Sequence, residues 1–490
     1  MQLNRLISNL KMICFLFALT CASATVKAQY VINDVFADLS ECDTMTRGIF
    51  IVWWDSDFNY SAQADVLLDS MISYQNTCLN SLSMEDPPNP TDGYFYNVYI
   101  HVPGDADDIF LPNGWANGQG TDFNGYPFLT LPGGILSDFS NTAHETFHVF
   151  QYSANAPGFE YYGDSQWYIE GSANWFAARE NPDIARAFVE AESLVRMPHV
   201  PLWLSYSNFP STYPENWQRY VHQYAMALFL YYLTDVEGVS EDLITSGLYS
   251  FTLEKPQEYM SNIIGKDLFR QYFIDWAAHM SNDFDFIPQF QADANLNEWM
   301  TYADLADDNE FIEIFENEGT TGWFTPDDAR TTNAWSFNTY KLLNTNSETY
   351  TFELNAEPMG TYGDSAYFQG KLLVQNSVSG ASFYDLDMTD NVQGSLSLSL
   401  TPQDTAIYYI VASTPQVFVD ANPSFQRFPY EMRITLGALT GITEMGSNII
   451  KEEVARFNLL GQQVKKGDGG VQVILYNDGT TEKRHAEIRD

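Results

Sequence analysis

The period of the hydrophobic positions changes along this chain. Short apolar runs at 48–54 and 94–102 predict strands, and apolar residues that recur every three or four positions across 61–79 predict a helix between them. From about residue 331 to 439 apolar and polar positions alternate, with Asn, Ser, Gly and Pro clusters between the runs. This pattern predicts an α+β domain followed by an all-β sandwich. The expected sandwich strands are 350–354, 370–375, 395–400, 406–412 and 430–436.

Composition and pattern together set the expected domain boundaries. Residues 1–28 combine early basic residues with an apolar run too short to span a bilayer and a Val-Lys-Ala end, which predicts a removable signal peptide. Once it is removed, we expect no membrane insertion. A chain of 490 residues is too long for one core. We expect the α+β domain at 29–326, the sandwich at 327–440 and a small β module at 444–490.

Charge narrows the classes of partner. The chain has 23 Lys and Arg against 64 Asp and Glu, a formal net charge of −41 at pH 7. Such an acidic chain repels phosphate groups, so we expect no nucleic-acid partner and no anionic membrane surface. Aromatic residues make up 15% of the sequence, which indicates that most of its length folds around cores.

Two cysteines lie beyond the expected signal peptide, Cys42 and Cys78. In an oxidising compartment they could form one disulfide between the start of the domain and its first helix. Two unpaired thiols are the alternative, and the sequence leaves both open.

The most specific motif is His-Glu-Thr-Phe-His at 144–148. On a helix, His144 and His148 lie one turn apart on the same face, so both ring nitrogens can converge on one metal ion. Glu145 would then take a proton from the water held in the open coordination position. The motif therefore predicts a zinc site with its own general base.

A third ligand is expected on the next helix. Glu170 stands 22 residues after His148, beyond a loop with Gly, Asn and Pro that lets the second helix fold back. Two His and one Glu leave one position of a zinc site open to water. Asn174, one helical turn after Glu170, is placed to accept a hydrogen bond from a ligand imidazole. For Glu170 the alternative is an ordinary exposed helical glutamate.

A glycine-rich acidic loop precedes this motif. Its carboxylate and amide oxygens could hold calcium. Their spacing matches no EF-hand, so a solvated acidic loop is the favoured interpretation. The residues concerned are Asp105, Asp107, Asp108, Asn113, Asn117, Asp122 and Asn124.

The H-E-x-x-H motif followed by Glu170 resembles the gluzincin group of zinc metallopeptidases. The segment IEGSANWFA at 169–177 is similar to a stretch of bacterial collagenase-like peptidases. This resemblance implies a zincin-like catalytic domain with zinc on His144, His148 and Glu170. Asn174 departs from the pattern, because the most similar relatives carry an acidic residue there.

The resemblance extends to residues 220–228, which are similar to a Tyr-x-x-Ala-Leu helix of these enzymes. By that analogy Tyr224 would donate a hydrogen bond to the oxyanion formed when water attacks a peptide carbonyl. Tyr220 and His222 remain rival donors. A tyrosine-rich helix packed in the core is the alternative for all three residues.

Residues 128–135, just before the expected metal helix, resemble the edge strand on which zinc peptidases align an extended substrate. An exposed edge can pair with a peptide as an added strand, and Pro132 fits a strand only at an edge or an end. Asp138 or Ser140 is the expected N-cap of the helix that follows.

Residues 444–490 resemble the C-terminal sorting module of the type IX secretion pathway of Bacteroidetes-type Gram-negative bacteria. The segments 455–464 and 470–475 predict a small antiparallel sheet, with Asn-Asp-Gly at 477–479 as a hairpin turn. Gln472 departs from the aromatic residue usual in that family. The resemblance implies the type IX machinery as a partner and a secreted or cell-surface location.

These observations favour a secreted zinc-dependent endopeptidase that acts on a protein or peptide substrate. One alternative is an extracellular binding or adhesion protein with a vestigial zincin site. Another is a zinc hydrolase of peptidoglycan or small peptides, which would share the same residues. The sequence does not name the substrate.

Overall fold

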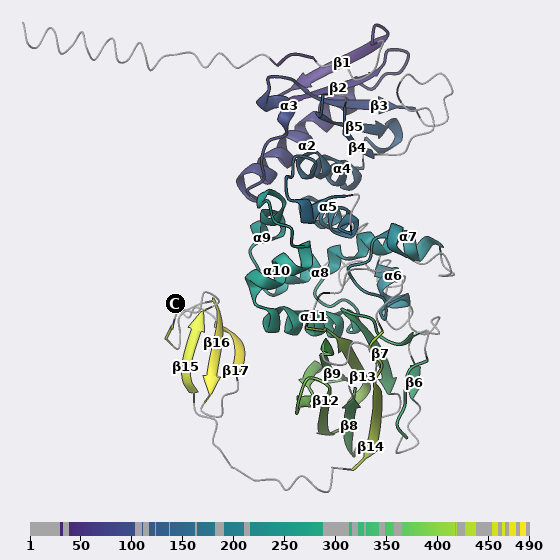
Figure 1. The fold of residues 1–490 in the computed structure, drawn as a ribbon, viewed down its shortest axis with the longest axis vertical. Helices are drawn as coiled ribbons and strands as arrows, with labels where there is room; N and C mark the ends of the chain where they lie inside the picture. Colours follow the sequence, from purple (N-terminus) through teal and green to yellow (C-terminus); the bar gives the residue numbers. More distant parts are fainter. Residues whose placement is uncertain are drawn as a thin grey trace, which may run out of the picture. The chain divides into compact units, whose positions relative to one another are not determined.

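The computed structural model divides the chain into two compact units, Met1–Gly437 and Ala438–Asp490 (Figure 1). The expected signal peptide at 1–28 lies outside the described residues. So do most members of the acidic loop and the hairpin turn at 477–479. The structure describes residues 30–32, 39–102, 110, 117–122, 124–136, 138–161, 164–181, 191–209, 216–287, 313–315, 322–327, 330–342, 348–356, 365–416, 418, 427–437, 453–458, 463–465, 470–476 and 481–486.

A five-stranded sheet begins the first unit, in the order β1-β2-β3-β5-β4. Strands β2, β3 and β5 run parallel to one another, and β1 and β4 pair with them antiparallel. All residues of β3 are buried, as expected for a strand covered on both faces. The strand bounds are β1 Cys42–Arg47, β2 Phe50–Asp55, β3 Tyr96–His101, β4 Asn117–Thr121 and β5 Pro127–Pro132.

The edge strand of this sheet differs from the prediction. The apolar strand before the metal motif, β5, is not an edge, because it lies between β3 and β4. The edge on the β5 side of the sheet is β4, whose sequence Asn-Gly-Gln-Gly-Thr has no apolar alternation to reveal a strand. Pro132 stands at the last position of β5, where a missing N–H is tolerated.

Helices cover one face of the sheet and continue beyond it (Figure 1). Alternate strand residues such as Val52 and Val98 face α2 and α4, while Trp53 and Tyr99 form a smaller cluster on the other face. The helices are α2 Ser61–Asn80, α3 Pro88–Thr91, α4 Phe139–Gln151, α5 Gln166–Glu180, α6 Ala191–Arg196, α7 Asn216–Ala225, α8 Ala227–Tyr231, α9 Glu241–Ser246, α10 Pro256–Ile264 and α11 Lys266–Ser281, with a π-helical turn at Tyr232–Val236.

The β-rich part of this unit contains two sheets, in the orders β10-β9-β13-β7-β6 and β11-β12-β8-β14. Phe352 of β8 and Tyr409 of β13 pack edge to face across them at 5.7 Å. Five of the strands, β8, β9, β12, β13 and β14, lie where alternation predicts them, and the other four were not predicted. Their bounds are β6 Glu313–Phe315, β7 Ser336–Leu342, β8 Thr349–Asn355, β9 Phe368–Asn376, β10 Gly380–Asp385, β11 Asp387–Met388, β12 Gln393–Ser399, β13 Asp404–Ser413 and β14 Glu431–Leu436.

Helix α11 joins the helical part to this sandwich. Trp276 packs against Phe337 of β7 at 5.8 Å. The Lys371 ammonium on β9 lies 2.6 Å from an Asp275 carboxylate oxygen. Both parts therefore share one continuous core within the first unit. The observed mixture of helices and a β-rich C-terminal part agrees with the expected α+β and all-β classes, and the boundary at residue 326 stays a prediction.

The second unit holds three antiparallel strands in the order β15-β16-β17, namely Glu453–Asn458, Gly470–Tyr476 and Thr481–Ala486. A small antiparallel sheet is what the sequence analysis predicts for this segment. Its role as a sorting module stays a prediction.

The structure bears on three other features of the sequence. It has Cys42 and Cys78 as thiols rather than as a disulfide, and burial raises the pKa of the Cys78 thiol well above its usual value.

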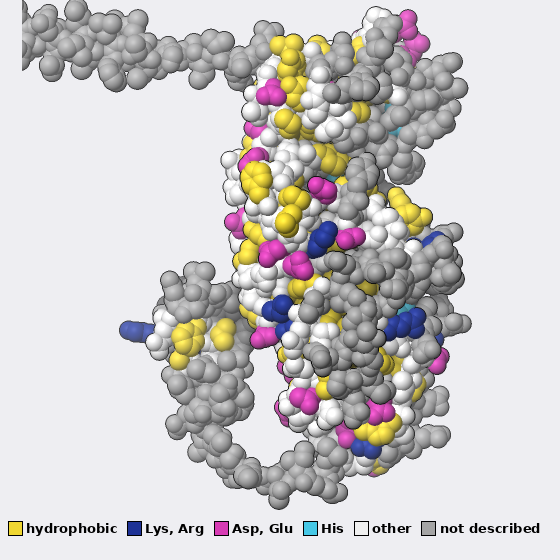
Figure 2. All heavy atoms as spheres, in the orientation of Figure 1, with side chains coloured by type: hydrophobic (Ala, Val, Ile, Leu, Met, Phe, Trp, Pro, Cys, Tyr) yellow, Lys and Arg dark blue, Asp and Glu magenta, His cyan; other side chains and the backbone are white. Residues whose placement is uncertain are grey.

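Asp122 accepts hydrogen bonds from the backbone N–H groups of Asn124 and Tyr126, so its carboxylate is used within a turn. Among the described helices, none has the length and hydropathy needed to span a bilayer. Acidic side chains are spread over the face drawn in Figure 2.

Candidate metal centre

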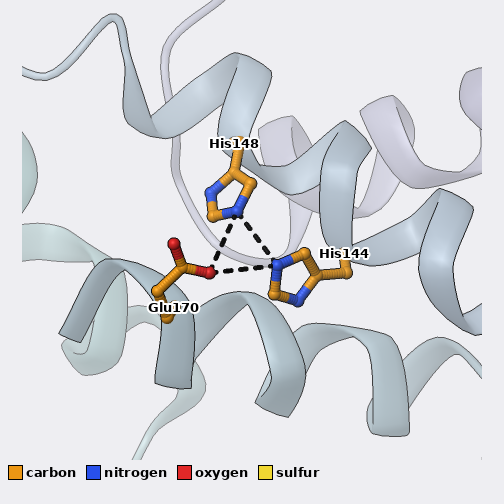
Figure 3. A group of neighbouring side chains, drawn as sticks. All are labelled: His144, His148 and Glu170. Atoms are coloured by element: carbon orange, nitrogen blue, oxygen red, sulfur yellow. Dashed lines mark hydrogen bonds and ion pairs between the residues drawn. The ribbon is translucent and has the colours of Figure 1, made fainter. Parts of the chain in front are cut away.

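Three of the predicted ligand side chains converge at one buried point between α4 and α5 (Figure 3). The Nε2 atoms of His144 and His148 lie 3.0 Å apart. Glu170 Oε2 lies 3.3 Å from His144 Nε2 and 3.6 Å from His148 Nε2. Within the described part of the chain, these two histidines and one glutamate form a buried group that could hold a metal ion.

The spacing of these donor atoms fits a zinc ion. Ligand atoms about 2.1 Å from zinc at tetrahedral angles lie about 3.4 Å from one another. The three observed separations, 3.0, 3.3 and 3.6 Å, surround that value. Two imidazoles and one carboxylate also form a ligand set that zinc prefers. His144, His148 and Glu170 would therefore hold the metal without a large rearrangement of either helix.

Local sequence explains why the two helices meet here. Asp138 is the N-cap of α4 and accepts a hydrogen bond from the Asn141 N–H at 3.1 Å. It is one of the two residues that the sequence predicted for this role. Phe147 stacks on Phe176 of α5 at 4.6 Å. This contact holds α4 against α5, the helix that also carries Glu170.

The glycine that follows Glu170 has a packing role. A Cβ atom at Gly171 would lie 3.2 Å from Met226 Sδ and 3.3 Å from the Gln223 carbonyl oxygen. These separations are shorter than ordinary carbon contacts, so glycine lets the segment around α7 and Met226 approach α5 closely. This approach brings Tyr224 next to the metal ligands.

Each ligand has a second partner on the side away from the centre. His144 Nδ1 donates a hydrogen bond to Asn174 Oδ1 at 2.7 Å, which confirms the predicted role of Asn174. His148 Nδ1 donates to Gln151 Oε1 at 2.7 Å. Because an amide oxygen can only accept, Nδ1 is the donor in both contacts, so in the neutral imidazoles the Nε2 atoms are left to bind a metal at the common centre.

Two of these outer residues were not predicted. The Gln151 amide nitrogen donates to the Ile169 carbonyl oxygen at 3.1 Å, which directs its amide oxygen toward His148. Tyr161 donates to Glu170 Oε1 at 2.9 Å and leaves Oε2 to face the histidines. Gln151 stands three residues after His148, a helical spacing that could have revealed it. Tyr161 lies in a loop, and no sequence spacing identifies it.

The pKa values of the ligands respond to one another. Burial disfavours the imidazolium form of His148, but the Glu170 carboxylate outweighs it and the pKa of His148 rises to about 9. Burial acts to raise the pKa of Glu170, yet the two imidazoles hold it well below the usual range. The centre therefore favours a carboxylate beside positive charge, which a metal ion can also supply.

The predicted base and the three candidate oxyanion donors differ in where they lie relative to the metal ligands. Glu145 is 9% exposed on α4, between the two histidine ligands in sequence. The Tyr224 ring lies 6.0 Å from the His144 ring. Tyr220 lies one turn before Tyr224, and their hydroxyl oxygens are 3.5 Å apart. His222 is fully buried and donates to the Pro201 carbonyl oxygen at 3.0 Å, away from the ligands.

The chain belongs to DUF6055, a family of unknown function, whose model matches residues 44–441. No curated protein matches it.

Some solved structures show distant likeness. One is a structure of ZmpB from Clostridium perfringens that contains its M60 catalytic domain and the CBM51-1 and CBM51-2 domains. The match has 8% identity and a TM-score of 0.26, and it covers 91% of this chain and 67% of that chain. Another is CorA, a surface-associated copper-binding protein of Methylomicrobium album BG8, with 11% identity, coverage of 26% and 98%, and a TM-score of 0.15. A third is BtGH115A, a 4-O-methyl-alpha-glucuronidase, with 8% identity, coverage of 72% and 56%, and a TM-score of 0.15. These TM-scores are too low to establish a shared fold.

Proposed function

We propose that this protein is a zinc-dependent endopeptidase of the gluzincin type. The observation that carries the proposal is the buried group of His144, His148 and Glu170, whose donor atoms have the separations of a zinc site. The same helix that supplies both histidines also supplies Glu145, the acid–base residue that hydrolysis needs.

Each residue has a definable part in peptide hydrolysis. A zinc ion held by the three ligands would supply Lewis-acid polarisation and lower the pKa of a water molecule. Glu145 accepts a proton from the water that attacks the peptide carbonyl carbon and gives it to the amine that leaves when the C–N bond breaks. Asn174 and Gln151 keep both ligand imidazoles in the tautomer that binds metal.

Tyr224, whose ring lies 6.0 Å from the His144 ring, is the donor that we assign to the substrate carbonyl oxygen. Burial, together with the nearby Glu170 carboxylate, raises the pKa of Tyr224 well above its usual value. Its hydroxyl therefore keeps its proton at neutral pH and can donate a hydrogen bond to the developing oxyanion. His222 does not fit this role, because its ring donates to Pro201 on the other side of α7.

We also propose that the protein acts outside the cell. The expected signal peptide at 1–28 and the resemblance of residues 444–490 to a type IX sorting module support this destination, and the three-stranded sheet of the second unit is compatible with it. The strongly acidic composition agrees with a protein or peptide substrate rather than nucleic acid.

Cleavage of labelled casein by the zinc-loaded protein tests the proposal. Glu145→Gln keeps the metal ligands and removes the base, so we expect zinc content to stay the same and cleavage to fall by at least about 100-fold. Glu237→Gln is a matched control, because Glu237 has the same 9% exposure and its carboxylate accepts a hydrogen bond from Tyr232. This control should cleave casein at the wild-type rate.

Two outcomes would overturn the proposal. Equal cleavage by wild type and Glu145→Gln would remove Glu145 from the reaction. A wild-type protein that binds zinc yet cleaves no protein or peptide would point instead to a binding protein with a vestigial site or to a zinc hydrolase of other substrates such as peptidoglycan.

A further inference from the structure

A row of aromatic rings leads from the metal ligands to the protein surface. The ring centroids of His144 and Tyr224 are 6.0 Å apart, those of Tyr224 and Tyr220 are 5.8 Å apart, and those of Tyr220 and Tyr206 are 5.7 Å apart. Tyr224 is partly buried, whereas the two outer rings, Tyr220 and Tyr206, are 44% and 43% exposed. Large aromatic side chains this exposed beside a buried polar centre call for an explanation.

The outermost ring is held in place by its backbone. Tyr206 begins a short 3-10 turn, Tyr206–Asn208, and its N–H donates to the side-chain oxygen of the buried Gln223 at 3.2 Å. Ser207 donates to Gln166 and Asn208 donates to Asp164, both at 3.3 Å, which ties the turn to the start of α5. The row is therefore built on the same helices that carry Glu170 and Tyr224.

The spacing of the rings is within reach of the side chains of an extended peptide. Side chains on one face of a strand repeat every two residues, about 6.8 Å apart. The steps between Tyr224, Tyr220 and Tyr206 are 5.8 and 5.7 Å, about 1 Å shorter than that repeat. A peptide whose carbonyl lies at the metal centre could place alternate side chains on successive tyrosine rings, where aromatic pairs gain free energy from ring contacts beyond that of buried area.

We propose that Tyr220 and Tyr206 form a substrate subsite that selects peptides with an aromatic side chain near the cleaved bond. This inference rests on the proposed peptidase function and names the substrate class for it. Tyr220 then acts through its ring, in contrast to Tyr224, which acts through its hydroxyl.

Two measurements on the zinc-loaded full-length protein test the subsite. The first is kcat/KM on internally quenched peptide pools in which each position in turn is fixed as Phe, Tyr, Leu, Ala or Asp. The second is binding of the same pools to the Glu145→Gln protein, which needs no cleavage. Wild type should prefer Phe or Tyr over Ala by at least about 10-fold at one or more positions.

The variants separate the ring from the hydroxyl. Tyr220→Ala should abolish the aromatic preference, mainly through KM, and Tyr220→Phe should keep both the preference and kcat. Tyr384→Ala, which removes a tyrosine of 38% exposure on β10, is the matched control and should change neither quantity.

The outcomes distinguish the two proposals. Cleavage with an aromatic preference that survives Tyr220→Ala would overturn the subsite and leave the peptidase function intact. Aromatic-dependent binding that needs Tyr220, without cleavage by wild type, would support the subsite and overturn the peptidase function. A loss of kcat for every peptide in Tyr220→Phe would make Tyr220 an oxyanion donor and overturn the subsite. Neither cleavage nor binding would overturn both.

Discussion

Two regions of this protein bury histidine in opposite ways. His148 lies on α4 and is 3% exposed. His199, which follows α6, is also 3% exposed, and His222 in α7 is 0% exposed. Burial lowers the pKa of His199 to about 3 and that of His222 to about 4. The pKa of His148 instead rises to about 9, because the Glu170 carboxylate outweighs the same effect of burial.

The difference shows what distinguishes a structural histidine from one in a candidate metal site. His222 faces the neutral Pro201 carbonyl and the Phe209 ring, so its burial favours the neutral form. His148 has a carboxylate 3.6 Å from its Nε2 atom and an amide oxygen that fixes its Nδ1 proton. Only the second environment is suited to positive charge, and the predictions below test that contrast.

Removal of the carboxylate should have the largest effect. Structural zinc sites with four ligands contribute about 10–16 kcal/mol, so loss of one ligand in Glu170→Gln should weaken zinc binding by about 1,000-fold or more. Competition with a chromophoric chelator measures the affinity. His222→Gln is the control and should bind zinc as wild type does. Equal affinities in wild type and Glu170→Gln would show that the triad is not a metal site.

The second prediction concerns acid stability. The folded-state pKa of His222, about 4, is below its unfolded value of about 6.5, so its stabilising effect is complete above pH 6.5 and is lost as pH falls toward 4. The loss from this group is about 3 kcal/mol. The groups near it are His199, which also prefers its neutral form, and Arg330 and Arg427 beyond His199.

Urea unfolding of wild type and His222→Gln at pH 7.5 and pH 4.5 measures this effect. We expect wild type to lose about 2–3 kcal/mol more than the variant between the two values. The pH dependence of groups that do not interact with His222 cancels in this difference. If both proteins lose the same free energy of unfolding, His222 is not protonated in the unfolding transition and the contrast with His148 fails.

The smallest predicted effect lies in the outer contacts of the site. Asn174→Ala removes the acceptor of the His144 Nδ1 proton, and such partners typically change metal affinity by about 10–100-fold. Asn174→Asp should keep the acceptor and bind zinc at least as tightly as wild type. A similar loss in both variants would mean that packing, rather than the hydrogen bond, is what Asn174 supplies.

Much of the site could be predicted from local spacing. His144 and His148 stand four residues apart, and Asn174 stands four after Glu170, so helix geometry alone places each pair on one face. The Asp138 cap was one of two predicted possibilities, and a short-range N-cap contact identifies it. The prediction that β5 is an edge strand was wrong because it also used local pattern alone. The apolar pattern located the strand but carried no information about which strands pair with it.

The sequence by itself indicated the elements that have a clear hydrophobic period, the change from α+β to all-β, and the residue types of a zinc site, because helical and strand periods are local properties of the chain. Only the tertiary structure decided that Glu170 faces the histidines, that Tyr161 and Gln151 fix the ligands, and that His222 points away from them. It also decided that Tyr206 joins the tyrosines of α7. These contacts join residues from different elements. Their geometry depends on how the helices pack, for example on the close approach that Gly171 permits, and no spacing along the chain specifies it.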